Sequence, residues 1–203
     1  MNEKKDFYTS SADESLKSME SMESMEETTI STKTIFDGKV IHLHLDDIRL
    51  PDGNVGFREY CTHNGAVCVI PITADNEVIC VRQYRYAIRK PLLEIPAGKL
   101  DSKDEDPNDA VRRELREETG ATSDNVTFLG LYYGSPALIN EKIYMYMAQD
   151  LTFGECDLDE DEFLEVVKIP IEEMVEMVLR GEIEDGKTQS AVLRAYMHLN
   201  GRK

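Results

Sequence analysis

Short apolar runs alternate with longer amphipathic stretches along the chain, and this pattern predicts an order of strands and helices. The runs with strand character cover residues 40–50, 57–60, 66–72, 78–83, 126–133, 142–148 and 163–169. Helical spacing covers residues 106–120, 171–180 and 188–199. Turn residues separate neighbouring strands at Pro51-Asp52-Gly53-Asn54 and at Asp75-Asn76. Because strands and helices interleave, we expect an α/β protein, an α/β/α sandwich built on a mixed sheet.

The first predicted helix has clear signals at both ends. Asp106 is a suitable N-cap, Pro107 suits the first helical position, and Gly120 can end the helix in a left-handed turn. Val111 and Leu115 form its apolar side. The sequence therefore predicts a helix of ordinary length with one side available for packing.

Three glutamates gather on this helix in the stretch RRELREETG, residues 112–120. Glu114, Glu117 and Glu118 lie three and four residues apart, which places them on one face. Like charges at such spacings destabilise a helix by about 0.2–0.5 kcal/mol per pair. The spacing alone allows two interpretations: a solvated face that pairs with arginines such as Arg113, or a site for hard divalent cations, which prefer carboxylate oxygens.

The acidic composition limits the classes of partner. The 203 residues include 40 Asp and Glu against 23 Lys and Arg, which gives a net charge of −17. Such a charge argues against binding to nucleic acid or to anionic membranes. No apolar run approaches the length of a membrane span, and the N-terminus lacks the apolar stretch of a signal peptide, so we expect a soluble, cytoplasmic protein.

Cysteine and histidine residues do not form a recognisable metal-binding pattern. The cysteines show no CxxC spacing, and we interpret them as reduced core thiols: Cys61, Cys68, Cys80 and Cys156. His42 and His44 share one face of a strand, but no third ligand stands at a suitable spacing. We therefore interpret these histidines as surface or interface residues.

The composition changes near residue 33 and suggests three regions. Residues 1–32 are rich in Ser, Thr, Glu and Met and contain the repeat SMESMESME, so we expect a disordered acidic tail. Residues 33–62 form an N-terminal strand region with a β-hairpin, and residues 63–203 form the main domain.

The glutamate-bearing helix belongs to a longer motif. The apolar segment Leu93–Leu100 breaks at Pro96 and Gly98 and is followed by a polar loop that leads into the helix. Gly98, Glu105, Arg113-Glu114-Leu115, Glu117-Glu118 and Gly120 together resemble the Nudix box. The match departs from the family pattern at one place, since six residues rather than five separate Gly98 from Glu105. We interpret the extra residue as a longer loop, which costs little free energy.

The resemblance implies a fold, a metal and ligands. It implies a Nudix-type sandwich with a mixed sheet, preceded by the N-terminal β-hairpin region. In the family, the glutamates that match Glu114, Glu117 and Glu118 hold the metal, with the backbone carbonyl at the position of Ala97. The expected cofactor is Mg²⁺, with Mn²⁺ as a possible substitute. Arg113 would orient a ligand carboxylate.

Segments outside the box resemble the ADP-ribose pyrophosphatase branch of the family. They include IFDGKVI, HNGAVCVIP, VRQYRYA and LLEIPAGKL, and the resemblance runs from about Lys33 to Leu199. By this resemblance, Arg58 and Arg85 contact the diphosphate or the terminal ribose, and Pro136 and Glu141 contribute to substrate binding. Ala137 departs from the pattern, since the branch usually has glycine after Ser-Pro.

A general base is also expected, and an acidic stretch offers candidates. Seven acidic residues fall between Glu155 and Glu165, in a segment that suits a mobile loop. By resemblance to related enzymes we select Glu160 or Glu162, while Glu118 is a third candidate for deprotonating the attacking water.

These observations lead to one functional hypothesis with two alternatives. We expect a Mg²⁺-dependent hydrolase that cleaves ADP-ribose, a nucleoside diphosphate sugar, to AMP and ribose 5-phosphate. The alternatives are a pyrophosphatase for another nucleotide sugar such as GDP-mannose, or a sensor that binds ADP-ribose without turnover. A homodimer formed by the early strands is expected by resemblance to the branch.

Overall fold

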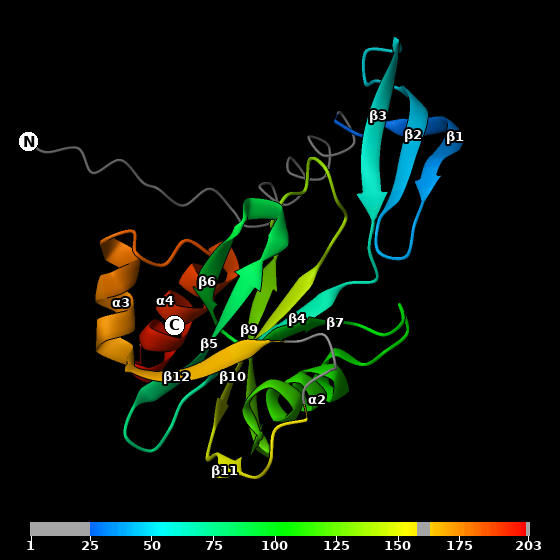
Figure 1. Ribbon diagram of the computed structural model, residues 1–203. Helices are drawn as coiled ribbons and strands as arrows, with labels where there is room; N and C mark the ends of the chain where they lie inside the picture. The colour runs from blue at the N-terminus through cyan, green and yellow to red at the C-terminus, as the bar shows by residue number, and fades with distance from the viewer. Residues whose placement is uncertain (1–24, 158–162, 202–203) are drawn as a thin grey trace, which may run out of the picture. The chain divides into compact units, whose positions relative to one another are not determined.

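The computed structural model describes residues 25–157 and 163–201 (Figure 1). The chain divides into two compact units, with the boundary between Thr62 and His63.

The first unit is an antiparallel sheet of three strands in the order β1-β2-β3. The strands are β1 (Thr28–Asp37), β2 (His42–Arg49) and β3 (Val55–Thr62). The turn between β2 and β3 is the predicted one, and its Gly53 has a φ of 86°. The sequence missed β1, whose residues are all exposed. Residues 28–32, which the sequence placed in the acidic tail, belong to this strand.

The second unit contains the remaining strands, which form a mixed sheet arrangement. They are β4 (Ala66–Pro71), β5 (Glu77–Arg85), β6 (Lys90–Glu94), β7 (Ala97–Lys99), β8 (Ala121–Thr122), β9 (Asn125–Tyr132), β10 (Ile143–Gln149), β11 (Thr152–Phe153) and β12 (Leu164–Pro170). One sheet has the order β7-β4-β10-β9, another has the order β12-β5-β6, and β11 pairs with β8. Because β10 runs parallel to β4 and antiparallel to β9, the expectation of a mixed sheet is confirmed.

Three α-helices complete the described part of this unit: α2 (Pro107–Thr119), α3 (Ile171–Leu179) and α4 (Gly186–Leu199). A short 3-10 turn, η1 (Tyr86–Ile88), joins β5 to β6. The ends of all three predicted helices lie within two residues of the observed ends. The range predicted for the first helix also includes its two capping residues.

Strand β4 shows why helices cover both faces of the sheet. Val67 and Val69 pack in one buried cluster with Leu115 of α2. Cys68 and Ile70 point the other way, into a cluster with residues of α3 and α4. Since neighbouring residues of a strand face opposite sides, α2 lies on one side of the sheet and α3 with α4 on the other (Figure 1). The predicted α/β/α sandwich is therefore confirmed.

The cysteines differ in their surroundings, although all four are free thiols. Cys68 and Cys80 lie in the core, where burial raises the pKa of each thiol to about 12. Cys61 is partly buried and Cys156 is exposed, so the interpretation of all four as core thiols is wrong for Cys156. Of the four cysteines, Cys156 lies in the least apolar stretch of the sequence, because acidic residues flank it. No helix in the described residues is long and apolar enough to cross a membrane.

Candidate active site

Helix α2 has the two ends that the sequence predicted. The Asp106 carboxylate accepts a hydrogen bond of 2.8 Å from the Asn108 N–H, and Pro107 occupies the first turn. Gly120 has a φ of 67°, and its N–H donates to the Arg116 carbonyl at 2.8 Å. These caps fix where the helix begins and ends, while burial of Val111 and Leu115 sets its rotation and therefore the face on which the glutamates stand.

Two of the three box glutamates are buried against strand β7. Glu114 is 8% exposed and Glu118 is 3% exposed. The Glu118 Oε2 accepts a hydrogen bond of 3.2 Å from the Ala97 N–H. A methyl group at Gly98 would come within 2.0 Å of the Glu114 carboxylate, so only glycine leaves room for that side chain. The break at Pro96 and Gly98 thus seats two carboxylates against the backbone.

Arg113 provides the positive charge within this acidic group. Its Nη1 donates to Glu114 Oε1 at 2.7 Å and to Glu117 Oε2 at 3.2 Å. Its Nη2 donates at 3.2 Å to both the Lys99 carbonyl and Glu105 Oε1. Burial alone would lower the pKa of Arg113, but Glu114 and its other acidic neighbours raise it above the ordinary arginine value. The guanidinium therefore stays charged and joins the helix to β7 and to the preceding loop.

Glu105 follows the loop that is one residue longer than the family pattern. One of its oxygens accepts from Arg113, and the other accepts from the Asp101 N–H at 2.5 Å. Glu105 therefore closes the loop onto the helix. The longer loop still delivers this carboxylate to the arginine of the box.

The donor types at this site fit a hard divalent cation. Buried carboxylates stand beside the partly buried backbone of β7, and oxygen is the donor that such cations prefer. Among residues 25–157 and 163–201, however, no three His, Cys, Asp or Glu side chains have the arrangement of a preformed metal site. Arg113 pairs with two of the carboxylates in this structure, so they would have to turn from it toward a cation.

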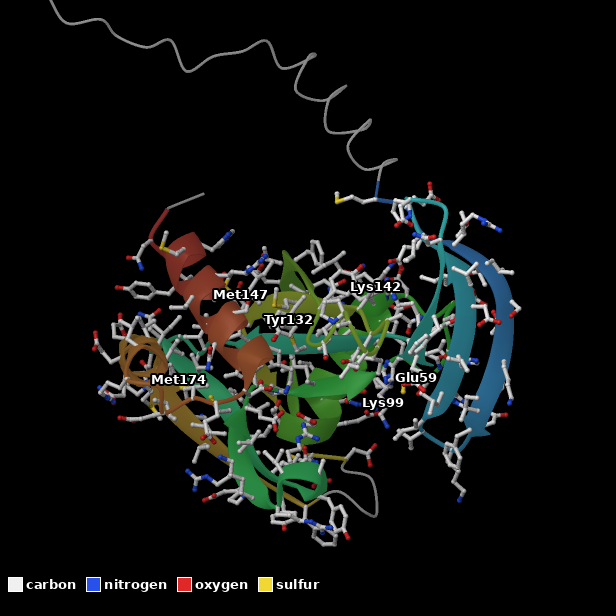
Figure 2. The ribbon with its side chains drawn as sticks, turned by 90° about the horizontal axis from the view of Figure 1, so that it is seen from above. Glu59, Lys99, Tyr132, Lys142, Met147 and Met174 are labelled. Carbon is white, nitrogen blue, oxygen red and sulfur yellow. The ribbon has the colours of Figure 1, made fainter. Side chains whose placement is uncertain are left out.

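A cleft of about 620 Å³ lies beside the box. Glu114, Glu117 and Arg113 line one part of it, together with Ala97 and Gly98. Lys99 of β7 and Tyr132 of β9, which also line the cleft, are labelled in Figure 2. Further lining residues come from β5 and from the start of α4: Gln83, Arg85, Asp185, Gly186 and Lys187.

The part of the cleft formed by β5 and α4 contains a charged group of its own. Arg85 binds the two oxygens of Glu94 through Nε at 2.6 Å and Nη2 at 2.7 Å. Lys187 also pairs with Glu94, which is 1% exposed, and it lies 3.0 Å from Asp185. Burial alone would raise the pKa of Glu94, but Arg85 and Lys187 lower it below the ordinary value. Burial alone would lower the pKa of Lys187, but Asp185 and Glu94 raise it, so Lys187 and Glu94 stay ionised at neutral pH.

The other predicted substrate residues have different locations. Glu141 lines the cleft, and its Oε1 lies 3.5 Å from His63 Nδ1. Pro136 stands in an exposed loop, where the N–H groups of Leu138 and Ile139 donate to the Ser135 carbonyl at 2.9 and 3.0 Å.

Two predictions concern residues that do not belong to the described part of the second unit. Arg58 belongs to β3 of the first unit, where it pairs with Glu27. The two base candidates, Glu160 and Glu162, lie outside the described residues.

Sequence reasoning missed Glu94, Asp185 and Lys187. Glu94 ends a strand in an apolar segment, and a charged residue in such a position is itself a signal of a buried pair. Asp185 is the N-cap of α4 and accepts from the Thr188 N–H at 2.9 Å. The helical spacing in the sequence predicts a start at Thr188. The predicted helix therefore includes neither the capping residue Asp185 nor Lys187.

Comparisons with known proteins agree with this geometry. Residues 62–191 match the NUDIX domain family, and residues 27–60 match the nucleoside diphosphate sugar hydrolase N-terminal domain. An ADP-ribose pyrophosphatase of Bacillus subtilis is 40% identical over 168 residues, covering 82% of this chain and 90% of the relative. A methanol dehydrogenase activator of Bacillus methanolicus is 42% identical over 168 residues, with the same coverage of both chains.

A solved structure also resembles the chain. The crystal structure of an ADP compounds hydrolase superposes with a TM-score of 0.76 at 25% sequence identity, covering 88% of this chain and 97% of that one. The NUDIX match covers more than half of the 203 residues, and it contains the box, the cleft and the charged groups described above. The chain therefore belongs to the Nudix family.

Proposed function

We propose that this protein is a divalent-metal-dependent hydrolase that cleaves the diphosphate of ADP-ribose to give AMP and ribose 5-phosphate. The observation that carries the proposal is a single cleft that combines the box carboxylates with Arg85 and Lys187. The named activity of the Bacillus subtilis relative, at 40% identity, supports the same substrate.

The charges of the cleft suit a diphosphate. The chain as a whole carries a net charge of −17, which repels an anionic substrate. Guanidinium and ammonium groups in the cleft offset that repulsion locally, and Arg85 offers a rigid fork that matches phosphate oxygens. A bound cation would further reduce the negative potential at the box.

Members of this family use divalent metal ions, and we propose Mg²⁺, with Mn²⁺ as a substitute. Glu114, Glu117, Glu118 and the carbonyl of Ala97 would hold it. When bound, the metal neutralises charge on the diphosphate oxygens and lowers the pKa of a water molecule. Arg113 holds the carboxylates of Glu114 and Glu117 in place until they bind the metal.

Proton transfer is assigned to a carboxylate near the attacking water. The Glu118 Oε2 accepts a hydrogen bond of 3.2 Å from the Ala97 N–H, which orients this carboxylate, and Glu118 is our first candidate for the role of ligand or base. Glu160 and Glu162 stay predicted alternatives for this role. Arg58, Pro136 and Glu141 stay predicted substrate contacts, and Glu141 is supported by its place in the cleft.

The decisive experiment is a substrate panel. The purified protein is incubated with ADP-ribose, GDP-mannose, UDP-glucose and NADH, each with Mg²⁺, with Mn²⁺ and with EDTA. We expect metal-dependent release of AMP and ribose 5-phosphate from ADP-ribose, identified by chromatography and phosphorus NMR. Equal rates on unrelated nucleotide sugars would contradict the assignment of ADP-ribose. Binding of ADP-ribose without products would instead support the sensor.

The Bacillus methanolicus relative favours a second candidate function, the activation of a dehydrogenase. The test measures the rate of a methanol dehydrogenase with and without this protein. The Glu118→Gln variant serves as the control. Activation by the wild-type protein but not by the variant would link activation to hydrolysis, whereas activation by both would indicate a binding role.

We also propose a homodimer, supported by the surface of the first unit. Its strands expose large apolar side chains, among them Ile30, Ile35, Phe36, Val55 and Phe57. Such a surface is typical of an interface with another chain. Sedimentation velocity should give twice the mass of the 203-residue chain, and Phe57→Glu should shift the protein to the monomer. A monomeric wild-type protein at micromolar concentration would contradict the dimer.

We also propose a cytoplasmic location, and the free cysteines agree with the reducing compartment expected from the sequence.

A further inference from the structure

Glu94 is the most deeply buried carboxylate among the residues that the structure describes. Its side chain is 1% exposed, yet two cations contact it. Arg85 binds both oxygens through two hydrogen bonds of 2.6 and 2.7 Å, and Lys187 adds a contact to Oε2. Burying a carboxylate is costly unless it is paired and hydrogen-bonded, so this arrangement specifies the positions of its partners closely.

The network joins three separate segments of the chain. Arg85 ends β5, Glu94 ends β6, and Lys187 lies in the first turn of α4, 93 residues from Glu94. The contact between β6 and α4 is reinforced next to it, because the Ile95 N–H donates to the Thr188 hydroxyl at 3.0 Å. That hydroxyl donates in turn to the Asp185 carboxylate at 2.6 Å. The position of Lys187 is therefore fixed by the start of a helix.

Arg85 is the member of the network that meets the open cleft. Its side chain is 41% exposed, whereas that of Lys187 is 11% exposed. A guanidinium has five N–H donors, and Nε and one donor of Nη2 are used on Glu94. The remaining donors belong to a side chain that lines the cleft and can reach a bound anion.

Lys187 changes the charge that Arg85 presents. With Glu94 alone, Arg85 would form a neutral pair, and its attraction for an anion would be largely cancelled. Lys187 pairs with both Glu94 and Asp185, so these four side chains carry no net charge, whereas Arg85 with the two carboxylates alone would carry a net negative charge that repels an anion. The lysine also holds Glu94 in the rotamer that supports the guanidinium.

We propose that Lys187, acting together with Glu94, is a positioning residue that orients Arg85 and preserves its charge for the diphosphate of the substrate. The inference rests on the proposed function, since it concerns the same cleft and the same reaction. Lys187 itself acts through Arg85 and does not take part in bond breaking.

The test is a double-mutant cycle on Arg85 and Lys187. In Lys187→Met, we expect the KM for ADP-ribose to rise about tenfold while kcat changes less than about threefold, because ground-state binding of the diphosphate weakens. Arg85→Ala should raise KM by at least the same factor. In the Arg85→Ala background, Lys187→Met should add less than about twofold to KM, since its effect passes through the arginine.

Lys90→Met is the matched control. Lys90 also joins β6 to the segment before α4, through Glu184, but both partners are exposed and neither lines the cleft. Its KM should stay within about twofold of the wild-type value. Lys187→Arg keeps the charge, so its KM should lie within about threefold of the wild-type value. A role of Lys187 in packing alone does not predict this recovery.

Loss of stability is separated from loss of positioning by a second variant and a second measurement. Lys187→Gln retains a hydrogen-bond donor without the charge, and circular dichroism with thermal melting shows which variants fold. A folded Lys187→Met or Lys187→Gln protein with unchanged KM would overturn the proposal. So would a multiplicative effect of the two substitutions in the double mutant.

Failure of the proposed function would be visible in the wild-type protein itself. If the wild-type protein binds ADP-ribose without hydrolysing it, the same cycle is measured as Kd by calorimetry. A tenfold rise in Kd that vanishes in the Arg85→Ala background would support the positioning role even then. If the wild-type protein neither binds nor cleaves ADP-ribose, both proposals fail.

Discussion

Two groups of acidic and basic side chains contribute residues to the same cleft, and they differ in their balance of formal charge. At the box, Arg113 pairs with the carboxylates of Glu105, Glu114 and Glu117, Arg116 makes one longer contact with Glu117, and Glu118 adds a fourth buried carboxylate on the same helix. At the start of α4, two cations and two carboxylates alternate: Arg85, Glu94, Lys187 and Asp185. The first group has an excess of negative charge and the second is balanced.

The difference indicates different tasks. A buried, balanced network holds its members in fixed positions, and removing one partner is strongly destabilising. An acidic group with too few cations is instead destabilised by its own repulsion and gains from binding a metal. We infer that the charged group at the start of α4 holds its side chains in fixed positions, whereas the acidic group at the box binds a metal ion. Substitutions should therefore affect stability in opposite directions on the two sides.

The largest effect on stability is expected for Glu94→Gln. This change leaves Arg85 and Lys187 without their shared carboxylate, so the free energy of unfolding should fall by about 3 kcal/mol. Urea titration followed by circular dichroism measures the loss. An unchanged midpoint would show that the network does not stabilise the folded protein. The proposed difference between the α4 side and the box side of the cleft would then be wrong.

The same variant gives a pH dependence with a definite sign. The pKa of Glu94 is lowered in the folded protein, so its contribution is present above the ordinary carboxyl range and is lost as pH falls through the lowered pKa. The difference in stability between wild-type protein and Glu94→Gln should therefore be full at neutral pH and shrink below about pH 4. A difference that grows toward acid pH would contradict the assignment.

Glu118→Gln tests the acidic side. We expect kcat to fall at least about 10²-fold, because a metal ligand or proton acceptor is lost. Without metal, its unfolding midpoint should equal or exceed that of the wild-type protein, since one repelling charge is gone. Differential scanning calorimetry with and without Mg²⁺ should show a smaller metal-induced increase in Tm than for the wild-type protein. Near-normal turnover would place the active site elsewhere.

Gly98→Ala should reduce activity with little change in stability. Its methyl group would meet the Glu114 carboxylate at 2.0 Å, and the end of that flexible side chain can move aside. We expect kcat to fall by about tenfold or more, because a ligand displaced by about 1 Å is costly for catalysis. Steady-state kinetics and thermal melting check the two halves of this prediction. A large loss of Tm with normal kcat would mean that the glycine serves packing instead.

Glu165→Gln is expected to have the smallest effect and is matched to Glu94→Gln. Glu165 also accepts from an arginine of β5, since Arg82 Nη1 lies 3.0 Å from its Oε2, but both side chains are exposed. Exposed ion pairs contribute roughly 0–1 kcal/mol, so the midpoint in urea should barely move. A loss as large as that of Glu94→Gln would show that burial does not distinguish the two pairs.

Local signals explain how much of this molecule was predictable from the sequence. The ends of α2 depend on Asp106, Pro107 and Gly120, and each acts within one helical turn of its own position. The glutamate face follows from spacing along that helix. Both were therefore predicted correctly, as were the strands with apolar alternation.

The missed features depend on contacts that no local pattern contains. Strand β1 forms by pairing with β2 and has no buried side chain of its own, so its composition resembles that of a tail. Glu94 and Lys187 meet across 93 residues of sequence, and although the apolar surroundings of Glu94 indicate a buried pair, a single sequence does not identify Lys187 as the partner. Folding of the chain, rather than spacing along it, brings them together.

The short connection between β6 and β7 limits the distance between two parts of the cleft. Glu94 ends β6 and Ala97 begins β7, so only Ile95 and Pro96 separate them. Three residues of chain span at most about 10–11 Å, even when fully extended. The carboxylate that holds Arg85 and the carbonyl proposed for the metal therefore stay within this limit of each other along the backbone, however the helices move. We expect a substrate with a much longer bridge than a diphosphate to reach only one of these two points.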